Sequence, residues 1–263
     1  MKILLTNDDG FDAPGINVLR ERLIDDGHEV YVMAPAANQS GKSHSINISG
    51  KMKVKEIDEN FYACAGSPAD CVMTAIHGRV FERADLILSG INRGPNLGLD
   101  ILYSGTCGAA RQGVLMGIPS AALSVMFDGD EIFGSESDGD YEAMADFAAK
   151  NLKALVSLCS VADGVKMPKE RCVFANVNGM AQSAPYKGAR FAGVSFREYV
   201  GDKVEFENSG DGVFERIFSG GKVISGAREY SDYQACIEGF AAVTRVYAEP
   251  TAAGALDAIE FKV

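Results

Sequence analysis

Apolar and polar residues form alternating blocks along the first half of the chain, and each block has the length of a strand or a helix. The first apolar run, Ile3 to Leu5, is short and unbroken, which predicts a strand buried on both faces. From Pro14 to Asp26 the apolar residues recur at helical spacing, after a proline and before Gly27. A strand followed by a helix in this way predicts the first unit of a parallel sheet covered by helices.

The later blocks of the first half repeat the two patterns. Strands are predicted over Glu29–Met33, Ala84–Ser89 and Pro119–Val125, and helices over Ser67–His77, Thr106–Met116 and Tyr141–Leu158. The helix that begins near Ser67 has the sequence of a capped first turn, Ser-Pro-Ala-Asp. We therefore expect an α/β fold with a mostly parallel sheet.

Beyond Cys172 the pattern changes to shorter extended segments, which are separated by polar stretches that contain glycine. Extended segments are predicted over Cys172–Val177 and Arg190–Tyr199, hairpin turns at Asn208–Gly212 and Ser219–Gly221, a strand over Ala241–Tyr247, and helices over Tyr233–Phe240 and Thr251–Ile259. No internal repeat or low-complexity linker divides the chain. The last third is therefore expected to elaborate the core rather than to form an independent domain.

The composition is that of an ordinary globular protein, with 47% hydrophobic and 23% charged residues. The 25 basic and 36 acidic residues give a net charge of −11 without a basic cluster, which argues against binding to a nucleic-acid polymer. No apolar run has the length of a membrane span, and Met1-Lys2 leads into a strand rather than a signal peptide, so we expect a cytoplasmic protein with no membrane partner. The six cysteines include no Cys-x-x-Cys pair, which favours buried free thiols over disulfides or zinc.

Two adjacent carboxylates, Asp8 and Asp9, follow the first predicted strand within the sequence Asn7 to Gly10. Ligands of open α/β sheets bind just beyond the carboxyl ends of the strands. Like charges at such a strand tip repel each other, and a bound cation removes the repulsion. The sequence Asn-Asp-Asp-Gly is also typical of a tight turn, so these residues by themselves fit either a cation site or a plain turn.

Polar loops also follow the second and third predicted strands. The second loop contains Ser40 and Gly41-Lys42-Ser43, which is not a P-loop because Ala36 stands where that motif needs a glycine. The third loop has glycines that do not match the dinucleotide-binding fingerprint, and no helix is expected directly after it. Its two asparagines, Asn92 and Asn96, can still offer carbonyl oxygens to a cation.

The segment Tyr103-Ser104-Gly105-Thr106 precedes a predicted helix. Amides and hydroxyls at a helix N-terminus bind phosphate well, although the same segment also fits a simple N-cap. Of the three histidines, His28 and His77 are expected at the surface or at helix ends, and contact between His44 and a substrate is left open.

The polar loops are expected to meet at one edge of the sheet, because parallel strands end on the same side. Together they supply only oxygen donors, from Asp8, Asp9, Ser40 and Asn92. Such a set, without cysteine or clustered histidine, favours magnesium, manganese or calcium over zinc.

Several of these segments, in this order, resemble the SurE family (survival protein E, the stationary-phase 5′/3′-nucleotidases). The matching motifs are Asn7–Gly10 with Ala13–Ile16, Ala34-Pro35 through Ser40-Gly41, Ser43–Ser45, Gly66–Val72, Ser89–Asn92 through Asn96–Gly98, and Tyr103–Thr106. The resemblance implies a Rossmann-like three-layer sandwich with a C-terminal hairpin and an exchanged arm. It also implies a metal-dependent phosphomonoesterase that hydrolyses nucleoside 5′- and 3′-monophosphates.

The resemblance also assigns roles to particular residues. It implies one divalent ion, Mg²⁺ or Mn²⁺, held by Asp8, Asp9, Ser40 and Asn92, and phosphate contacts from Asn96, Ser104, Gly105 and Thr106. Two segments depart from the family pattern, namely Pro35–Gln39 and the residues that follow Asn178. The first departure leaves the preference for base and sugar open.

We expect in-line attack on phosphorus by a metal-activated water, with Asp8, Asp9 and His44 as the catalytic residues. One alternative is a regulatory protein that binds nucleotides without turnover. An acyl hydrolase has no support in the sequence, because no Gly-x-Ser-x-Gly elbow is present.

We expect a nucleotidase core over 1–225, which includes an inserted β-hairpin, and a C-terminal oligomerisation arm over 226–263. The tail alternates apolar and polar residues after an already complete α/β pattern. Family members exchange their C-terminal segments, and Ser231 to Thr244 resembles the start of that region. A homodimer or homotetramer is therefore expected.

Overall fold

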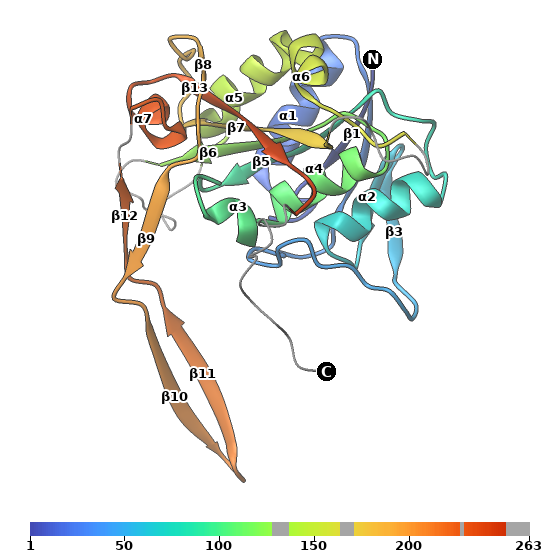
Figure 1. The fold of residues 1–263 in the computed structure, drawn as a ribbon. Helices are drawn as coiled ribbons and strands as arrows, with labels where there is room; N and C mark the ends of the chain where they lie inside the picture. Colours follow the sequence, from blue (N-terminus) through green and yellow to red (C-terminus); the bar gives the residue numbers. More distant parts are fainter. Residues whose placement is uncertain (128–136, 164–170, 227–228, 251–263) are drawn as a thin grey trace, which may run out of the picture.

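A nine-stranded sheet forms the centre of the molecule (Figure 1). The computed structural model describes residues 1–127, 137–163, 171–226 and 229–250. The strands of this sheet are β1 (Lys2–Thr6), β2 (Glu29–Pro35), β3 (Val54–Asp58), β4 (Phe61–Cys64), β5 (Leu86–Arg93), β6 (Ser120–Met126), β7 (Val173–Met180), β8 (Ala189–Phe191) and β13 (Ala241–Tyr247). They lie in the order β3-β4-β2-β1-β5-β6-β7-β13-β8. The run from β4 to β7 is parallel, and β3 and β13 pair antiparallel with its two ends.

Helices cover both faces of the sheet (Figure 1). They are α1 (Pro14–Asp25), α2 (Pro68–His77), α3 (Asp100–Tyr103), α4 (Gly105–Leu115), α5 (Gly139–Lys150), α6 (Leu152–Leu158) and α7 (Asp232–Ile237). Side chains of a strand alternate between faces, so Ile3 and Leu5 pack in the cluster that contains α1, α5 and α6. Leu4 packs on the other face, against α2 and α4. The three-layer α/β fold expected from the sequence is confirmed.

Local sequence explains why α2 begins where it was expected. The Ser67 hydroxyl accepts a hydrogen bond from the Asp70 amide at 3.1 Å, and the Asp70 carboxylate accepts one from the Ser67 amide at 2.9 Å. This reciprocal capping box supplies partners for amides that have none within the helix. The proline that follows Ser67 has the backbone angle of a first helical turn.

Several elements differ from their sequence prediction. The helix expected over Tyr141–Leu158 is divided into α5 and α6 at Asn151, whose side-chain amide donates to the Phe147 carbonyl at 2.8 Å. The third strand continues through Asn92 to Arg93, because a bulge between Ser89 and Asn92 lets the pairing with β6 resume. Helix α3 begins soon after Gly98, where no helix was expected. Strands β3 and β4 were not predicted.

The inserted hairpin consists of two ribbons joined end to end. One ribbon pairs β9 (Phe196–Val200) with β12 (Lys222–Gly226), and the other pairs β10 (Lys203–Gly210) with β11 (Val213–Ser219). The turn predicted at Asn208–Gly212 joins β10 to β11 as expected. The segment Ser219–Gly221 is not a hairpin turn, because β11 and β12 pair with different strands. Figure 1 shows the β10–β11 ribbon extending far from the sheet.

The described part of the segment after residue 225 packs on the body of its own chain. Strand β13 pairs with β7 and with β8, and α7 packs beside it. The helix expected at Thr251–Ile259 lies outside the described residues, and exchange of the tail with a partner stays a prediction. Among the helices that the structure describes, none is both long and apolar enough to cross a bilayer.

Candidate active site

The polar segments at the carboxyl ends of β1, β2 and β5 meet around one cavity of about 340 Å³. Its lining includes most of the residues that the sequence analysis selected, namely Asp8, Ser40, Asn92, Asn96 and Ser104. The parallel pairing of β1 with β2 and β5 brings these segments to the same edge of the sheet. The expected meeting of the three loops is therefore observed.

Asp8 is the centre of the hydrogen-bond network at this edge. Its carboxylate is only 3% exposed and accepts hydrogen bonds from the hydroxyl of Thr106 and, at 3.2 Å, from the Thr106 amide. Burial raises the pKa of Asp8, while the Thr106 hydrogen bonds lower it. A Cβ atom at Gly105 would lie 2.9 Å from the Asp8 Cβ, so a glycine is needed for this close approach of α4.

The oxygen of the Asn92 side chain faces the Thr106 hydroxyl, which also donates to Asp8. The Asn92 amide nitrogen donates to the Gly94 carbonyl at 2.8 Å, which leaves Oδ1 facing the Thr106 hydroxyl at 3.3 Å. Asp9 is half-buried, and its Oδ2 accepts a hydrogen bond from the Arg93 amide at 3.0 Å. Both carboxylates are thus fixed by backbone donors from neighbouring elements.

Ser40 lies in a loop attached to the same strand tip. The Gln39 amide donates to the Asp8 carbonyl at 2.7 Å, which ties the loop after β2 to the end of β1. The Ser40 amide donates to the Asn38 side chain at 2.9 Å, and Ser40 itself is exposed at the cavity. No group of three or more His, Cys, Asp or Glu side chains converges in the described ranges. The candidate ligand set therefore combines two carboxylates with two neutral oxygen donors.

These donors fit a divalent cation such as Mg²⁺ or Mn²⁺. Hard cations prefer carboxylate, amide and hydroxyl oxygens. A carboxylate as buried as Asp8 is costly to ionise, and a cation beside it removes much of that cost. The Asn92 amide nitrogen is taken up by the Gly94 carbonyl, so its oxygen is the atom left for a cation in the cavity that Asn92 shares with Asp8.

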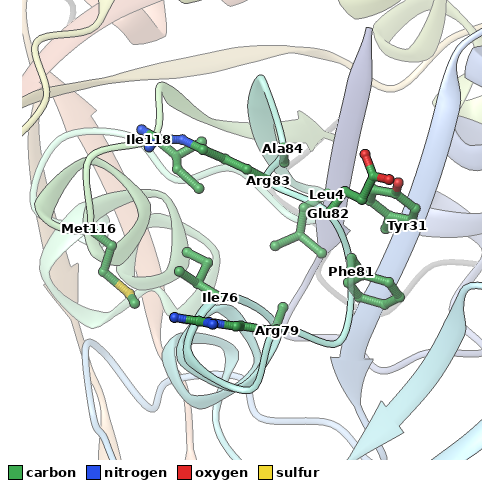
Figure 2. Close-up of a pocket in the computed structure, with 11 residues that line it drawn as sticks. Leu4, Tyr31, Ile76, Arg79, Phe81, Glu82, Arg83, Ala84, Met116 and Ile118 are labelled. Carbon is green, nitrogen blue, oxygen red and sulfur yellow. The ribbon is translucent and has the colours of Figure 1, made fainter.

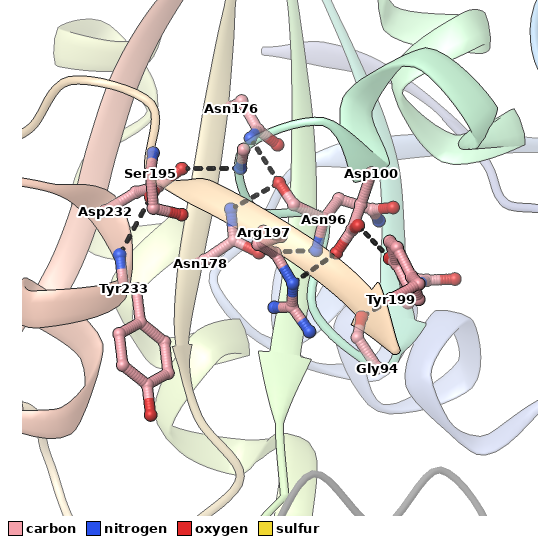
Figure 3. A network of polar contacts seen from close by, with 12 residues as sticks. Gly94, Asn96, Asp100, Asn176, Asn178, Ser195, Arg197, Tyr199, Asp232 and Tyr233 are labelled. Atoms are coloured by element: carbon pink, nitrogen blue, oxygen red, sulfur yellow. Dashed lines mark hydrogen bonds and ion pairs between the residues drawn. The ribbon is translucent and has the colours of Figure 1, made fainter. Parts of the chain in front are cut away.

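Asn96 is held by a network of buried polar side chains on β6 and β7 (Figure 3). The Asn178 side chain accepts from the Asn96 amide at 2.8 Å, and the Asn176 side chain donates to the Asn96 carbonyl at 2.8 Å. The side-chain nitrogen of Asn96 donates to the Ser124 hydroxyl at 2.8 Å. Sequence analysis assigned no role to these partners, although two asparagines on an otherwise apolar strand mark polar contacts in the core.

Two residues of the predicted phosphate segment have other partners in this structure. The Ser104 hydroxyl accepts from the Cys107 amide at 2.9 Å, as in a simple N-cap. Both donors of Thr106 are directed to Asp8. Ser104 also lines the cavity, so a phosphate contact at this helix start stays a prediction.

His44 lies beside the middle of α4 and does not line the cavity. Its Nε2 is hydrogen-bonded to the Gln112 side chain at 2.8 Å, and burial lowers the pKa of the imidazole. The preceding Ser43 is tied to the α3 segment by a hydrogen bond from its amide to the Tyr103 carbonyl at 2.9 Å. A catalytic role for His44 stays a prediction from the sequence.

A second cavity, of about 500 Å³, lies at the opposite edge of the sheet (Figure 2). It is formed by the end of α2 and by the segments that precede β5 and β6, with Arg79, Phe81, Arg83 and Met116 in its lining. None of the site residues predicted from the sequence lines it. The carboxyl edge, not this cavity, is therefore the candidate active site.

The fold and the site define an α/β protein with an oxygen-lined ligand cavity at the carboxyl edge of a parallel sheet. The model of the Survival protein SurE family matches residues 3–200, and the chain belongs to this family. The resemblance found in the sequence motifs is thus confirmed.

Individual relatives agree with this assignment. A protein from Cereibacter sphaeroides (strain ATCC 17029 / ATH 2.4.9), named 5′-nucleotidase SurE, is 35% identical over 268 residues, which cover 99% of this chain and 98% of that protein. A protein of the same name from Desulfitobacterium hafniense (strain DSM 10664 / DCB-2) is 43% identical over 158 residues, and the match spans 59% of this chain and 60% of the relative's length. The crystal structure of the SurE protein from Aquifex aeolicus is similar with a TM-score of 0.74 and 33% identity, over 95% of both chains.

Proposed function

We propose that this protein is a 5′-nucleotidase that hydrolyses nucleoside monophosphates with the help of one divalent cation. The names of relatives that align along the whole chain support the nucleotidase activity. The observation that carries the metal dependence is the buried Asp8 carboxylate, which lines the same cavity as Asn92 and shares the Thr106 hydroxyl with the Asn92 oxygen. Activity on 3′-monophosphates is a further prediction from the sequence.

The residues divide into those that hold the cation and those that bind phosphate. Asp8, Asp9, Ser40 and Asn92 would hold the cation. When bound, the cation would neutralise charge on the phosphate and would lower the pKa of a water molecule, so that hydroxide is available as the nucleophile. Asn96 and the start of α4 would bind the non-bridging oxygens, and Thr106 orients Asp8. Water adds to phosphorus in line as the bond to the nucleoside oxygen breaks, which releases nucleoside and inorganic phosphate.

The test is phosphate release from a panel of nucleoside monophosphates, with and without exhaustive chelation. Activity should disappear on chelation and return with Mg²⁺ or Mn²⁺. Asp9→Asn should lose most turnover and keep the fold, because Asp9 lies at the rim rather than in the core. Asp12→Asn is the matched control, since Asp12 is an exposed carboxylate three residues further along the chain and is not one of the oxygen donors proposed to hold the cation.

Two results would contradict the proposal. Full activity after chelation and dialysis would exclude the metal mechanism. Tight nucleotide binding without phosphate release from any member of the panel would instead support the regulatory alternative. A cytoplasmic location and a homodimer or homotetramer stay predictions from the sequence.

A further inference from the structure

One wall of the candidate active site comes from the inserted hairpin. Arg197 and Tyr199 on β9 and Val223 on β12 line the cavity together with Asp8 and Asn96. Sequence analysis assigned no function to this region, because the hairpin is distant in the chain from the metal-binding motifs. Figure 3 shows Arg197 and Tyr199 lying beside Asn96 and Asp100.

Arg197 is a buried cation held by a specific partner. Its side chain is only 4% exposed, and its Nε lies 3.2 Å from Oδ2 of Asp100 on α3. The other carboxylate oxygen of Asp100 accepts a hydrogen bond from the Tyr199 hydroxyl. Burial raises the pKa of Asp100, whereas the Arg197 charge and the Tyr199 hydroxyl lower it. A guanidinium buried this deeply is costly unless such partners fix it.

A purely structural role does not account for this ion pair, because another carboxylate already attaches β9 to the body. Asp232 is fully buried, and it accepts hydrogen bonds from the Ser195 amide at 2.8 Å and from the Gly98 amide at 3.1 Å. This clamp joins the start of the hairpin to the loop after β5. At Gly98, which has a φ of +53°, a Cβ would lie 2.3 Å from the Ser195 carbonyl oxygen. The two segments therefore meet backbone to backbone, without help from Arg197.

What the Asp100 contact does fix is the direction of the guanidinium. Asp100 pairs with Nε, and Figure 3 shows the two terminal nitrogens pointing away from that carboxylate. The same cavity is lined by Asn96 and Ser104, which are expected to contact phosphate. A planar guanidinium matches the oxygens of a phosphate group better than any other cationic side chain.

We propose that Arg197 is a substrate-binding residue that contacts the phosphate of the nucleotide, and that Asp100 and Tyr199 are the residues that position it. This inference rests on the proposed function, since it identifies a further contact to the same phosphate. Arg197 contributes positive charge from the hairpin, whereas the acidic residues that would hold the cation follow β1. The hairpin is then part of the active site as well as a projection from the sheet.

The experiment measures binding of inorganic phosphate to the Mn²⁺-loaded protein by calorimetry, and KM and kcat for a nucleoside monophosphate. Arg197→Gln should weaken phosphate binding by about 10- to 100-fold, as expected for the loss of charge-assisted hydrogen bonds. Arg197→Lys should recover part of the loss, because it keeps the charge without the planar fork. Tyr199→Phe should weaken phosphate binding by about threefold through looser positioning of Arg197.

Arg190→Gln is the matched control. Arg190 pairs with Glu238 at the surface and does not line the active-site cavity, so this variant should bind phosphate like the parent. Mn²⁺ affinity should be unchanged in all of these variants, which separates loss of phosphate contact from damage to the metal site. A folded Arg197→Gln variant with parental phosphate affinity would overturn the inference. If that variant does not fold, parental phosphate affinity in Arg197→Lys together with Tyr199→Phe would overturn it.

Failure of the proposed function has a different signature. In that case the parent protein releases no phosphate from any nucleoside monophosphate, whatever its affinity for phosphate. The calorimetric comparison of the parent with Arg197→Gln needs no turnover, so it still decides whether Arg197 is an anion-binding residue.

Discussion

Replacing Thr106 with valine tests how the buried Asp8 carboxylate is stabilised. Valine keeps the shape of threonine and removes the hydroxyl that donates to Asp8, and both side chains lie in the interior. A hydrogen bond to a charged group contributes about 1.5–3 kcal/mol. We therefore expect Thr106→Val to lower the free energy of unfolding of the metal-free protein by about that amount at a pH where Asp8 is ionised in both proteins, as measured by urea denaturation.

The pH dependence of this loss distinguishes the hydrogen bond from simple packing. The missing donor raises the already elevated pKa of Asp8 further, so the stability difference between parent and variant is complete above the variant's pKa. It should shrink as the pH falls between the variant's and the parent's folded-state pKa values, where Asp8 becomes protonated. Thr106→Ser keeps the hydroxyl and loses one buried methyl, which costs about 1 kcal/mol at every pH. A Thr106→Val variant as stable as the parent at every pH at which the fold is stable, or a loss that does not change with pH, would refute the reasoning.

Three further predictions concern other parts of the molecule. Asp232→Ala should lower the free energy of unfolding by about 3–5 kcal/mol, because it leaves two buried amides without a partner. Glu238→Ala, which removes a partly exposed ion pair with Arg190, should change it little in the same denaturation assay. Burial holds the pKa of His44 below its usual 6.5, so the folded protein binds a proton at His44 less readily than the unfolded chain does. The free energy of unfolding should therefore decrease as the pH falls from about 6.5 toward the folded-state pKa of His44. His44→Gln should reduce this acid sensitivity in thermal melts, and an unchanged pH profile would contradict the assignment. Light scattering of the full-length chain should report a dimer or tetramer, and a monodisperse monomer at micromolar concentration would count against the exchanged tail. Deletion of residues 251–263 tests that tail more cleanly than deletion from Gly226, which also removes strand β13 from the sheet.

Local sequence by itself determined most elements of the core and the residues of the candidate metal site. The proline in the first turn of α1 and the capping box of α2 act within a few residues, so they define helix starts without knowledge of the fold. Parallel strands end at the same edge, and this rule alone placed Asp8, Ser40 and Asn92 together. Sequence motifs also identified the family correctly.

Only the tertiary structure decided which donors each site residue uses. Thr106 donates hydrogen bonds from its hydroxyl and its amide to Asp8. The sequence predicts that a helix starts near Thr106, but it does not predict which acceptor the donors of that first turn contact. Asn96 depends on partners in β6 and β7, and Arg197 depends on Asp100 and reaches the cavity from a hairpin nearly a hundred residues away. Such pairings are set by the packing of whole elements. A sequence pattern records the period of each element but not the atoms that it meets on its neighbours.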